Sequence, residues 1–123
     1  MNPGLTKTFT AETAVAAYRI VKHGSGDTSV VQAAAVSDSL LGVTGQLAGE
    51  AGKRVEAVMS DTCEVEFGGT VTRGDWLTSD ANGKAVTAAP AAGVNNNVIG
   101  RAMCSGVLGD IGSVMLMGTR IQG

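Results

Sequence analysis

The sequence predicts an all-β fold, a small β-barrel or sandwich built from an internally duplicated β-unit. No segment of ten residues has the apolar spacing of 3.6 residues that is typical of a helix. Glycine and other turn-forming residues recur at the short intervals typical of small β domains. The chain also contains two similar halves, and its 123 residues are enough for one domain.

The internal similarity is clearest at short segments centred on glycine. Three pairs carry it: residues 41–43 and 99–101 at an offset of 58, residues 49–52 and 109–112 at an offset of 60, and Tyr18 and Trp76 at an offset of 58. We interpret them as traces of a repeated β-unit, with pseudo-repeats over about residues 14–67 and 70–120. The alternative is a chance similarity between glycine-rich segments.

The first half is expected to contain an extended N-terminal segment followed by short strands. Residues 1–13 have no turn signal that pairs them with the next strand, which predicts an arm or an edge strand, with terminal disorder as the alternative. Residues 33–39 are small and can form a single helical turn. The strands expected in this half are residues 18–22, 29–32, 40–44, 53–59 and 62–67.

The second half shows the strongest hairpin signal of the chain, Asp-Ala-Asn-Gly at residues 80–83. Residues 88–97 have no periodicity and predict a surface loop. The strands expected in this half are residues 70–72, 75–78, 85–87, 98–104 and 113–117.

Seven residues are expected to shape the turns. Glycine supplies backbone conformations with positive φ, and Asn or Asp side chains accept hydrogen bonds from nearby backbone N–H groups. These residues are Gly49, Gly52, Asn82, Gly83, Gly109, Asp110 and Gly112.

No set of side chains suggests catalysis, so we expect no catalytic residue, no cofactor and no metal site. The only histidine, His23, precedes a glycine-rich turn. Glu64 and Glu66 share one face of a strand and are expected to point to solvent, opposite Cys63 in the core. The glycines have the wrong spacing for a phosphate-binding loop. We expect no disulfide between Cys63 and Cys104, because such bonds are rare in a reducing cytosol.

The charge distribution and hydropathy indicate no nucleic-acid or membrane partner. The net charge is −2, without blocks of one sign. No apolar run approaches 18 residues, and we expect no export signal within this sequence. With only four aromatic residues the core is thin, which favours association with other subunits.

The second half also carries a distinctive series of motifs: Gly-Asp-Trp-Leu at residues 74–77, Lys-Ala-Val at 84–86, Ile-Gly-Arg-Ala at 99–102, and Gly-Asp-Ile-Gly-Ser-Val-Met-Leu at 109–116. This combination resembles the tailed-bacteriophage capsid cement, or head decoration, proteins. The general pattern extends over about residues 14–118.

The resemblance implies a non-enzymatic protein on the outer capsid surface of the virion, made in the host cytoplasm. Its partners would be the major capsid protein, whose neighbouring capsomers it would tie together, and further copies of itself in a homotrimer. On this hypothesis residues 1–13 contact the capsid, with Leu5, Lys7 and Phe9 on one side of the extended segment.

Two alternatives stay open. One is another β-type virion component, such as a tail-tube or head-fibre base protein. The other is a small ligand- or carbohydrate-binding β-barrel. Sugar sites usually present exposed aromatic rings, whereas Tyr18 and Trp76 are expected at paired strand positions in the core.

Overall fold

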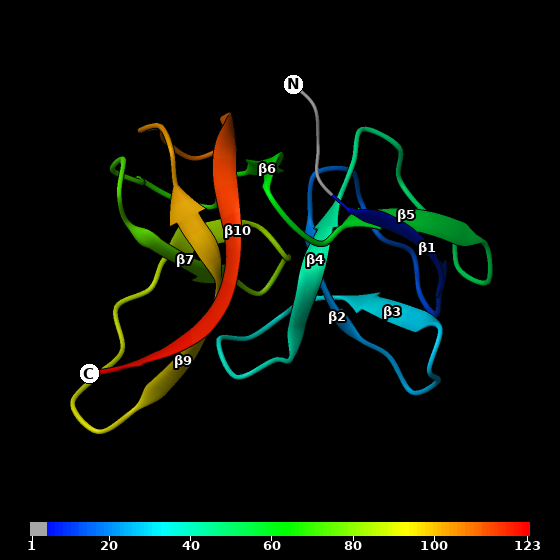
Figure 1. Cartoon of the computed structure of the whole chain (residues 1–123), viewed down its shortest axis with the longest axis horizontal. Coiled ribbons are helices and arrows are strands. Elements are labelled where there is room, and N and C mark those ends of the chain that lie inside the picture. Colours follow the sequence, from blue (N-terminus) through cyan, green and yellow to red (C-terminus); the bar gives the residue numbers. More distant parts are fainter. Residues whose placement is uncertain (1–4) are drawn as a thin grey trace.

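The computed structural model describes residues 5–123, and in that range the chain forms ten strands and no helix (Figure 1). The predicted all-β class is therefore confirmed. The strands are β1 (Thr6–Ala11), β2 (Ile20–His23), β3 (Ser29–Gln32), β4 (Leu40–Thr44), β5 (Arg54–Val58), β6 (Thr62–Glu66), β7 (Trp76–Ser79), β8 (Ala85–Thr87), β9 (Asn95–Ala102) and β10 (Ile111–Gln122).

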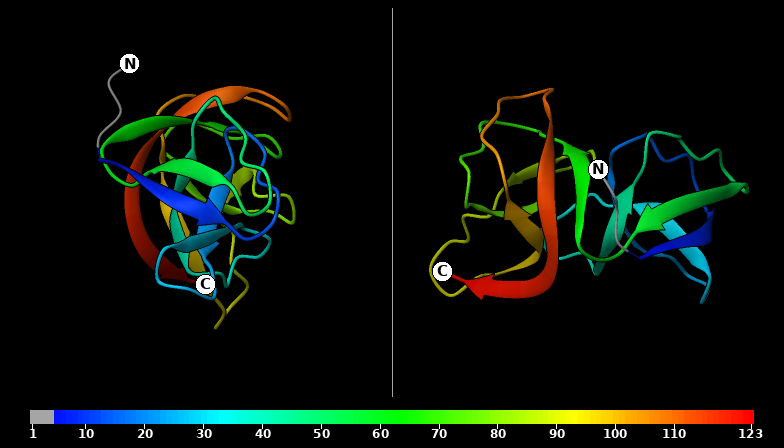
Figure 2. Two further views of the ribbon diagram at one scale, coloured as in Figure 1. Left: turned by 90° about the vertical axis from the view of Figure 1, so that its right-hand side faces the viewer. Right: turned by 45° about the horizontal axis from the view of Figure 1, so that its top comes forward.

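The strands form two units that lie side by side (Figures 1 and 2). The first unit is a closed barrel with the order β1-β3-β2-β4-β5. The second is a five-stranded sheet with the order β6-β10-β9-β7-β8, and a parallel bridge between Phe67 and Ala85 joins its two ends. The first strand of one unit, β1, can be matched with the first strand of the other, β6, and so on to β5 and β10. Each strand then pairs with the equivalents of its partners in the other unit. The chain thus contains the same β-unit twice.

Gly42 of β4 and Gly100 of β9 mark equivalent positions in the two units. A Cβ atom at Gly42 would collide with the backbone oxygen of Val58, and one at Gly100 with the backbone oxygen of Met115. Each glycine therefore allows the neighbouring strand to approach closely. The offset of 58 expected for this pair agrees with the structure.

The other two expected offsets are wrong. Antiparallel bridges join Val15 to Gly49 and Val71 to Gly106, so Gly49 corresponds to Gly106 rather than to Gly109. Offsets that differ along the chain arise because equivalent connections differ in length by one or two residues.

Tyr18 corresponds to Gly74 and not to Trp76. Both residues precede the second strand of their unit and have positive φ, 57° at Tyr18 and 96° at Gly74. Ile20 is the residue equivalent to Trp76, since each is the first residue of its strand.

The N-terminal segment is a barrel strand and not a free arm or an edge strand. Thr6–Thr10 pair with β5, and Thr10 and Ala11 pair with β3. β1 is therefore part of the barrel: β5, more than 40 residues further along the chain, returns to pair along it, and β3 pairs with its last two residues. The first repeat begins at β1 rather than at residue 14. Residues 1–4 lie outside the described residues.

Three further segments differ from expectation. Residues 70–72, expected as a strand, contribute only the isolated bridge between Val71 and Gly106. Residues 33–39 form turns without a helix, and Asp38 accepts hydrogen bonds from the N–H groups of Ala34 and Ala35 at 2.8 and 3.0 Å. Residues 95–97, expected in a loop, belong to β9 and pair with Arg120–Gln122 of β10.

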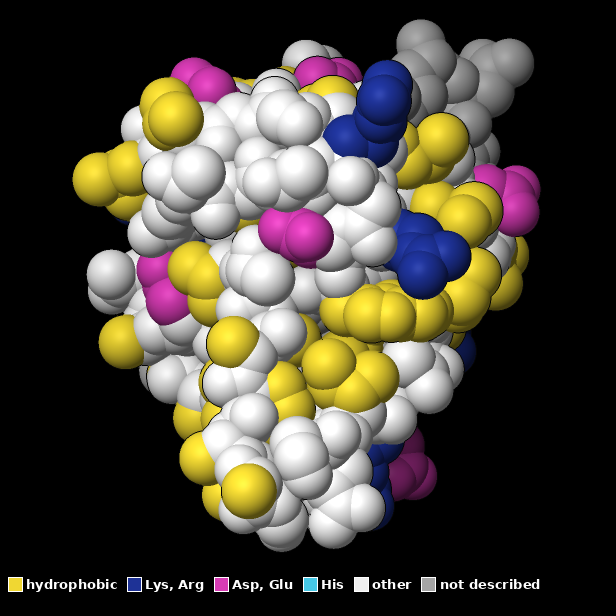
Figure 3. Space-filling model, turned by 90° about the vertical axis from the view of Figure 1, so that its left-hand side faces the viewer, with side chains coloured by type: hydrophobic (Ala, Val, Ile, Leu, Met, Phe, Trp, Pro, Cys, Tyr) yellow, Lys and Arg dark blue, Asp and Glu magenta, His cyan; other side chains and the backbone are white. Residues whose placement is uncertain are grey.

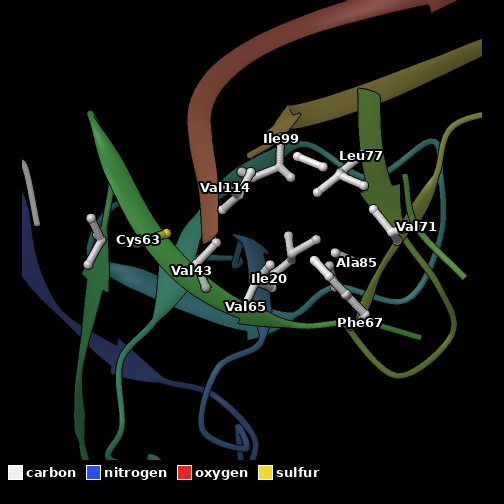
Figure 4. Packing of buried hydrophobic residues seen from close by; sticks show 13 residues of the cluster. Ile20, Val43, Cys63, Val65, Phe67, Val71, Leu77, Ala85, Ile99 and Val114 are labelled. Atoms are coloured by element: carbon white, nitrogen blue, oxygen red, sulfur yellow. The ribbon is translucent and has the colours of Figure 1, made fainter. Parts of the chain in front are cut away.

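A hydrophobic core joins the two units (Figure 4). Ile20 and Val43 of the first unit point toward Val65 and Val114 of the second. A backbone hydrogen bond also connects the units, in which the N–H of Ile20 donates to the carbonyl oxygen of Gly83 at 2.8 Å. A second cluster fills the first barrel: Phe9, Ala11, Val15, Val21, Val30, Val55 and Ala57.

Candidate interaction surface

The described part of the chain contains no group of three or more His, Cys, Asp or Glu side chains placed to hold a metal ion. His23 ends β2 with its side chain exposed. Within residues 5–123, no helix is available that could cross a membrane.

Glu66 does not point freely to solvent, in contrast to the expectation. Its carboxylate forms ion pairs with Arg19 at 3.0 Å and with Lys84 at 3.1 Å. Arg19 also donates to the backbone oxygen of Asn82 at 3.1 Å. Glu64, two residues earlier, is exposed as expected. Since Arg19 belongs to the first unit and the other groups to the second, this charge cluster connects the two units.

Both cysteines are free. Burial of the Cys63 side chain, with a smaller contribution from the negative charge of Glu64, raises the pKa of its thiol to about 12. Cys63 packs in the core that joins the units, whereas Cys104 is half-buried. The raised pKa and the burial of Cys63 make its thiol a poor nucleophile.

Five of the seven expected turn residues lie where the chain reverses. Gly52, Gly83 and Gly109 have φ values of 78°, 74° and 90°, which favour glycine. A carboxylate oxygen of Asp110 accepts the N–H of Val107 at 2.9 Å.

Asn82, the remaining member of these five, lies in the β7–β8 hairpin. Its N–H donates to the Asp80 carboxylate at 2.8 Å. The Asn82 side chain therefore has a smaller part in this turn than the side chain of Asp80, which begins the hairpin motif but was not among the seven expected turn residues.

The other two expected turn residues serve close packing. A Cβ atom at Gly49 would lie 2.7 Å from the Val55 Cβ atom. Gly112 lies within β10, where a Cβ atom would collide with the Phe67 ring. At Gly112 the assignment to a turn was wrong, because β10 begins one residue earlier.

The expected contact residues of the N-terminal segment have different surroundings. The Leu5 residue is 62% exposed and Lys7 is also exposed. Phe9 is only 6% exposed because alternate β1 side chains face the barrel interior, so it is not available for contact. The Lys7 Nζ atom lies 5.5 Å from the centre of the Phe9 ring. A groove of about 610 Å³ runs beside β1 and is bordered by Thr6, Thr8 and Leu47, among others.

The connection between β9 and β10 carries a group of exposed hydrophobic side chains that sequence reasoning missed. Met103, Val107, Leu108 and Ile111 are 47, 55, 65 and 46% exposed. Figure 3 shows hydrophobic side chains at many points of the surface on the side of the second unit. The available signal was the apolar Val-Leu pair between Gly106 and Gly109, which was interpreted only as part of a turn.

Trp76 and Tyr18 are both half-buried, in place of the expected core positions. The guanidinium carbon of Arg101 lies 4.5 Å from the centre of the Trp76 ring, so one ring face is covered. Phe9 and Phe67 are buried. The described residues thus provide no fully exposed aromatic ring on which a sugar would stack.

Comparison with known proteins yields a family and a similar fold. A family model described as phage cement protein matches residues 1–111. The crystal structure of the head fibre gp8.5 N base of bacteriophage phi29 superposes with a TM-score of 0.69 at 21% sequence identity, over 97% of this chain and 98% of that one. At this identity the likeness concerns the fold. None of the curated protein sequences matches the chain.

Proposed function

This chain belongs to the phage cement protein family, and on that basis we propose that it attaches to the outer surface of an assembled capsid and bridges neighbouring capsomers. It is a structural component of the phage virion. The observation that carries the proposal is the family match, which extends over residues 1–111 of the 123. We propose that the protein acts by binding alone, without a catalytic step.

The two-unit architecture supports a bridging role. The units lie side by side, and a shared core and the cluster around Glu66 hold them together. A protein that touches two capsomers resists their separation only if its two ends are mechanically connected. Several weak contacts on one shell then add up through effective concentration.

Leu5 and Lys7 remain our proposed contacts at the start of β1, since both side chains are exposed. Phe9 contributes to the core instead and would act only by shaping the strand. β5 pairs with Thr6–Thr10 of β1, whereas β3 pairs only with Thr10 and Ala11, and we propose that contact at the start of the strand uses the exposed side chains of Leu5 and Lys7.

Co-sedimentation with expanded capsid shells that lack this protein tests the proposal. We expect the protein to pellet with the shells, and the double variant Leu5→Asp/Lys7→Glu to pellet less. Val94→Asp is the matched control, because Val94 is also exposed but lies in the loop before β9. A wild-type protein that stays in the supernatant at saturating shell concentration would contradict the proposal.

Self-association into a homotrimer is part of the proposal and has its own test. The low aromatic content, with four aromatic residues in 123, leaves a thin core and favours association. Size-exclusion chromatography with light scattering should give three times the mass of 12.3 kDa. A mass of one chain at micromolar concentration would show that the trimer does not form in solution.

A second candidate is the base of a head fibre, which the similar phi29 structure favours. Both candidates place the chain on the virion. Electron microscopy of particles decorated with the full protein distinguishes them, because a fibre base carries density that projects away from the shell.

A further inference from the structure

We propose that the turn between β9 and β10 docks on an apolar patch of the capsid's outer surface. This apolar turn comprises Met103, Val107, Leu108 and Ile111. The inference rests on the proposed capsid attachment and assigns to it a contact surface separate from the start of β1.

The first unit provides an internal comparison, because its β4–β5 connection has the same backbone arrangement. Gly52 donates to the Ala11 oxygen at 2.7 Å, and Gly109 donates to the Phe67 oxygen at 3.0 Å. Both glycines have positive φ. The bridges of Gly49 and Gly106 to the preceding segment are also equivalent. The two connections therefore have the same backbone conformation, and equivalent residues in them are 57 positions apart in the sequence.

The side chains at equivalent positions differ in character. Glu50, Ala51 and Arg54 in the first unit are replaced by Val107, Leu108 and Ile111 in the second. All six residues are exposed. The β4–β5 connection has its own exposed apolar residue, Leu47, but at these three positions it has polar and small residues, so the fold does not require apolar side chains there. Exposed apolar groups that the fold does not need are typical of a contact surface.

The electrostatics of the turn favour an apolar partner. Asp110 is the only charged residue between Met103 and Ile111. Its carboxylate accepts the backbone N–H of Val107 at 2.9 Å within the turn. The first unit has Lys53 at the equivalent position. The exposed surface of the second turn is thus mainly hydrocarbon. A charged or strongly hydrated partner surface would not match it.

The size of the patch favours the capsid over a second free copy as occupant. The four partly exposed side chains together present at most a few hundred Å² of apolar surface. A stable interface between two free proteins buries about 800 Å² on each partner. A shell repeats its surface many times and is contacted at the start of β1 as well, so a small patch adds usefully to binding there through avidity.

The test transfers the residues of the first turn to the second. The variant Val107→Glu/Leu108→Ala/Ile111→Arg has side chains that the equivalent backbone already accepts. Glu50→Gln/Arg54→Gln is the control, with changes confined to the first turn. Shell binding is measured by co-sedimentation, alongside the unfolding midpoint and the light-scattering mass of the free protein. If the triple variant fails to fold, Val107→Ser/Leu108→Ser replaces it.

We expect at least a tenfold weaker shell affinity for the variant, with the control, the unfolding midpoint and the mass unchanged. Equal binding of variant and wild type would overturn the inference and leave the proposed function standing. A smaller mass for the free variant would also overturn it, because the occupant would then be a second copy. Failure of the wild type to bind shells would overturn the proposed function together with this extension.

Discussion

Tyr18 and Gly74 show how two residues meet one backbone requirement in the two units. Both precede the second strand of their unit with positive φ, a conformation that costs an L-residue about 1–2 kcal/mol. Glycine avoids that cost, and at Gly74 a Cβ atom would meet no neighbour within 4 Å. Backbone strain is therefore the only penalty for a side chain at this position.

Gly74→Ala should lower the free energy of unfolding by about 1 kcal/mol through this strain. Gly45→Ala is the control, because its Cβ would also meet no neighbour and its φ lies outside the positive range. Urea denaturation measures both variants. Equal losses in the two would show that the strain at residue 74 is not the cause.

Cys63 and Cys104 should differ in reactivity. Burial raises the pKa of the Cys63 thiol to about 12, so at pH 8 it is almost fully protonated as well as inaccessible. Mass spectrometry after alkylation of the native protein should therefore show modification at Cys104 before Cys63. In guanidinium chloride both should react at similar rates. Rapid native labelling of Cys63 would contradict the described core.

At the scale of elements, the cluster around Glu66 connects β6 with the segment before β2. Glu66→Gln removes the charge that balances Arg19 and Lys84, whose side chains are partly buried. We expect a loss of about 1–2 kcal/mol in unfolding free energy, below the range for fully buried pairs. Glu64→Gln, on the same strand but exposed, should change it by less than about 0.5 kcal/mol. If thermal or urea unfolding gave equal losses for Glu66→Gln and Glu64→Gln, the charge cluster would have no structural role.

Local patterns predicted most strands, and long-range pairing explains the exceptions. β3, β4 and β8 have the expected bounds, since β-forming residues there lie between turn signals. β1 was interpreted as an arm or an edge strand because no turn signal pairs it with the next strand, whereas its partner β5 is distant in sequence. Residues 95–97, three asparagines, are poor β-formers. They are strand residues because β10 extends to Gln122 and pairs with them.

The candidate surface was predictable only in part. Leu5 and Lys7 are exposed as expected, although they precede the buried Phe9 on the same side of the extended segment. Burial of Phe9 depends on barrel closure, which no local pattern reveals. The apolar pair Val107 and Leu108 is visible in the sequence, but only the hydrogen bonds that match it with Glu50 and Ala51 show that the fold does not require it.

At the scale of the whole molecule, the shared core predicts that the two units unfold together. Val30→Ala in the first barrel and Leu77→Ala in the second each create a cavity in a fully buried site. Each should shift one common transition, and circular dichroism and Trp76 fluorescence should report the same midpoint. Separate midpoints for the two probes in either variant would show that the units are independent domains.

The central claim, attachment to the outside of a capsid across neighbouring capsomers, is tested most directly by cryo-electron microscopy of shells decorated with this protein. We predict density on the outer surface into which the two-unit structure fits, with the apolar turn toward the shell and contacts to two capsomers. Decorated shells whose added density touches a single capsomer, or lies inside the shell, would contradict the claim.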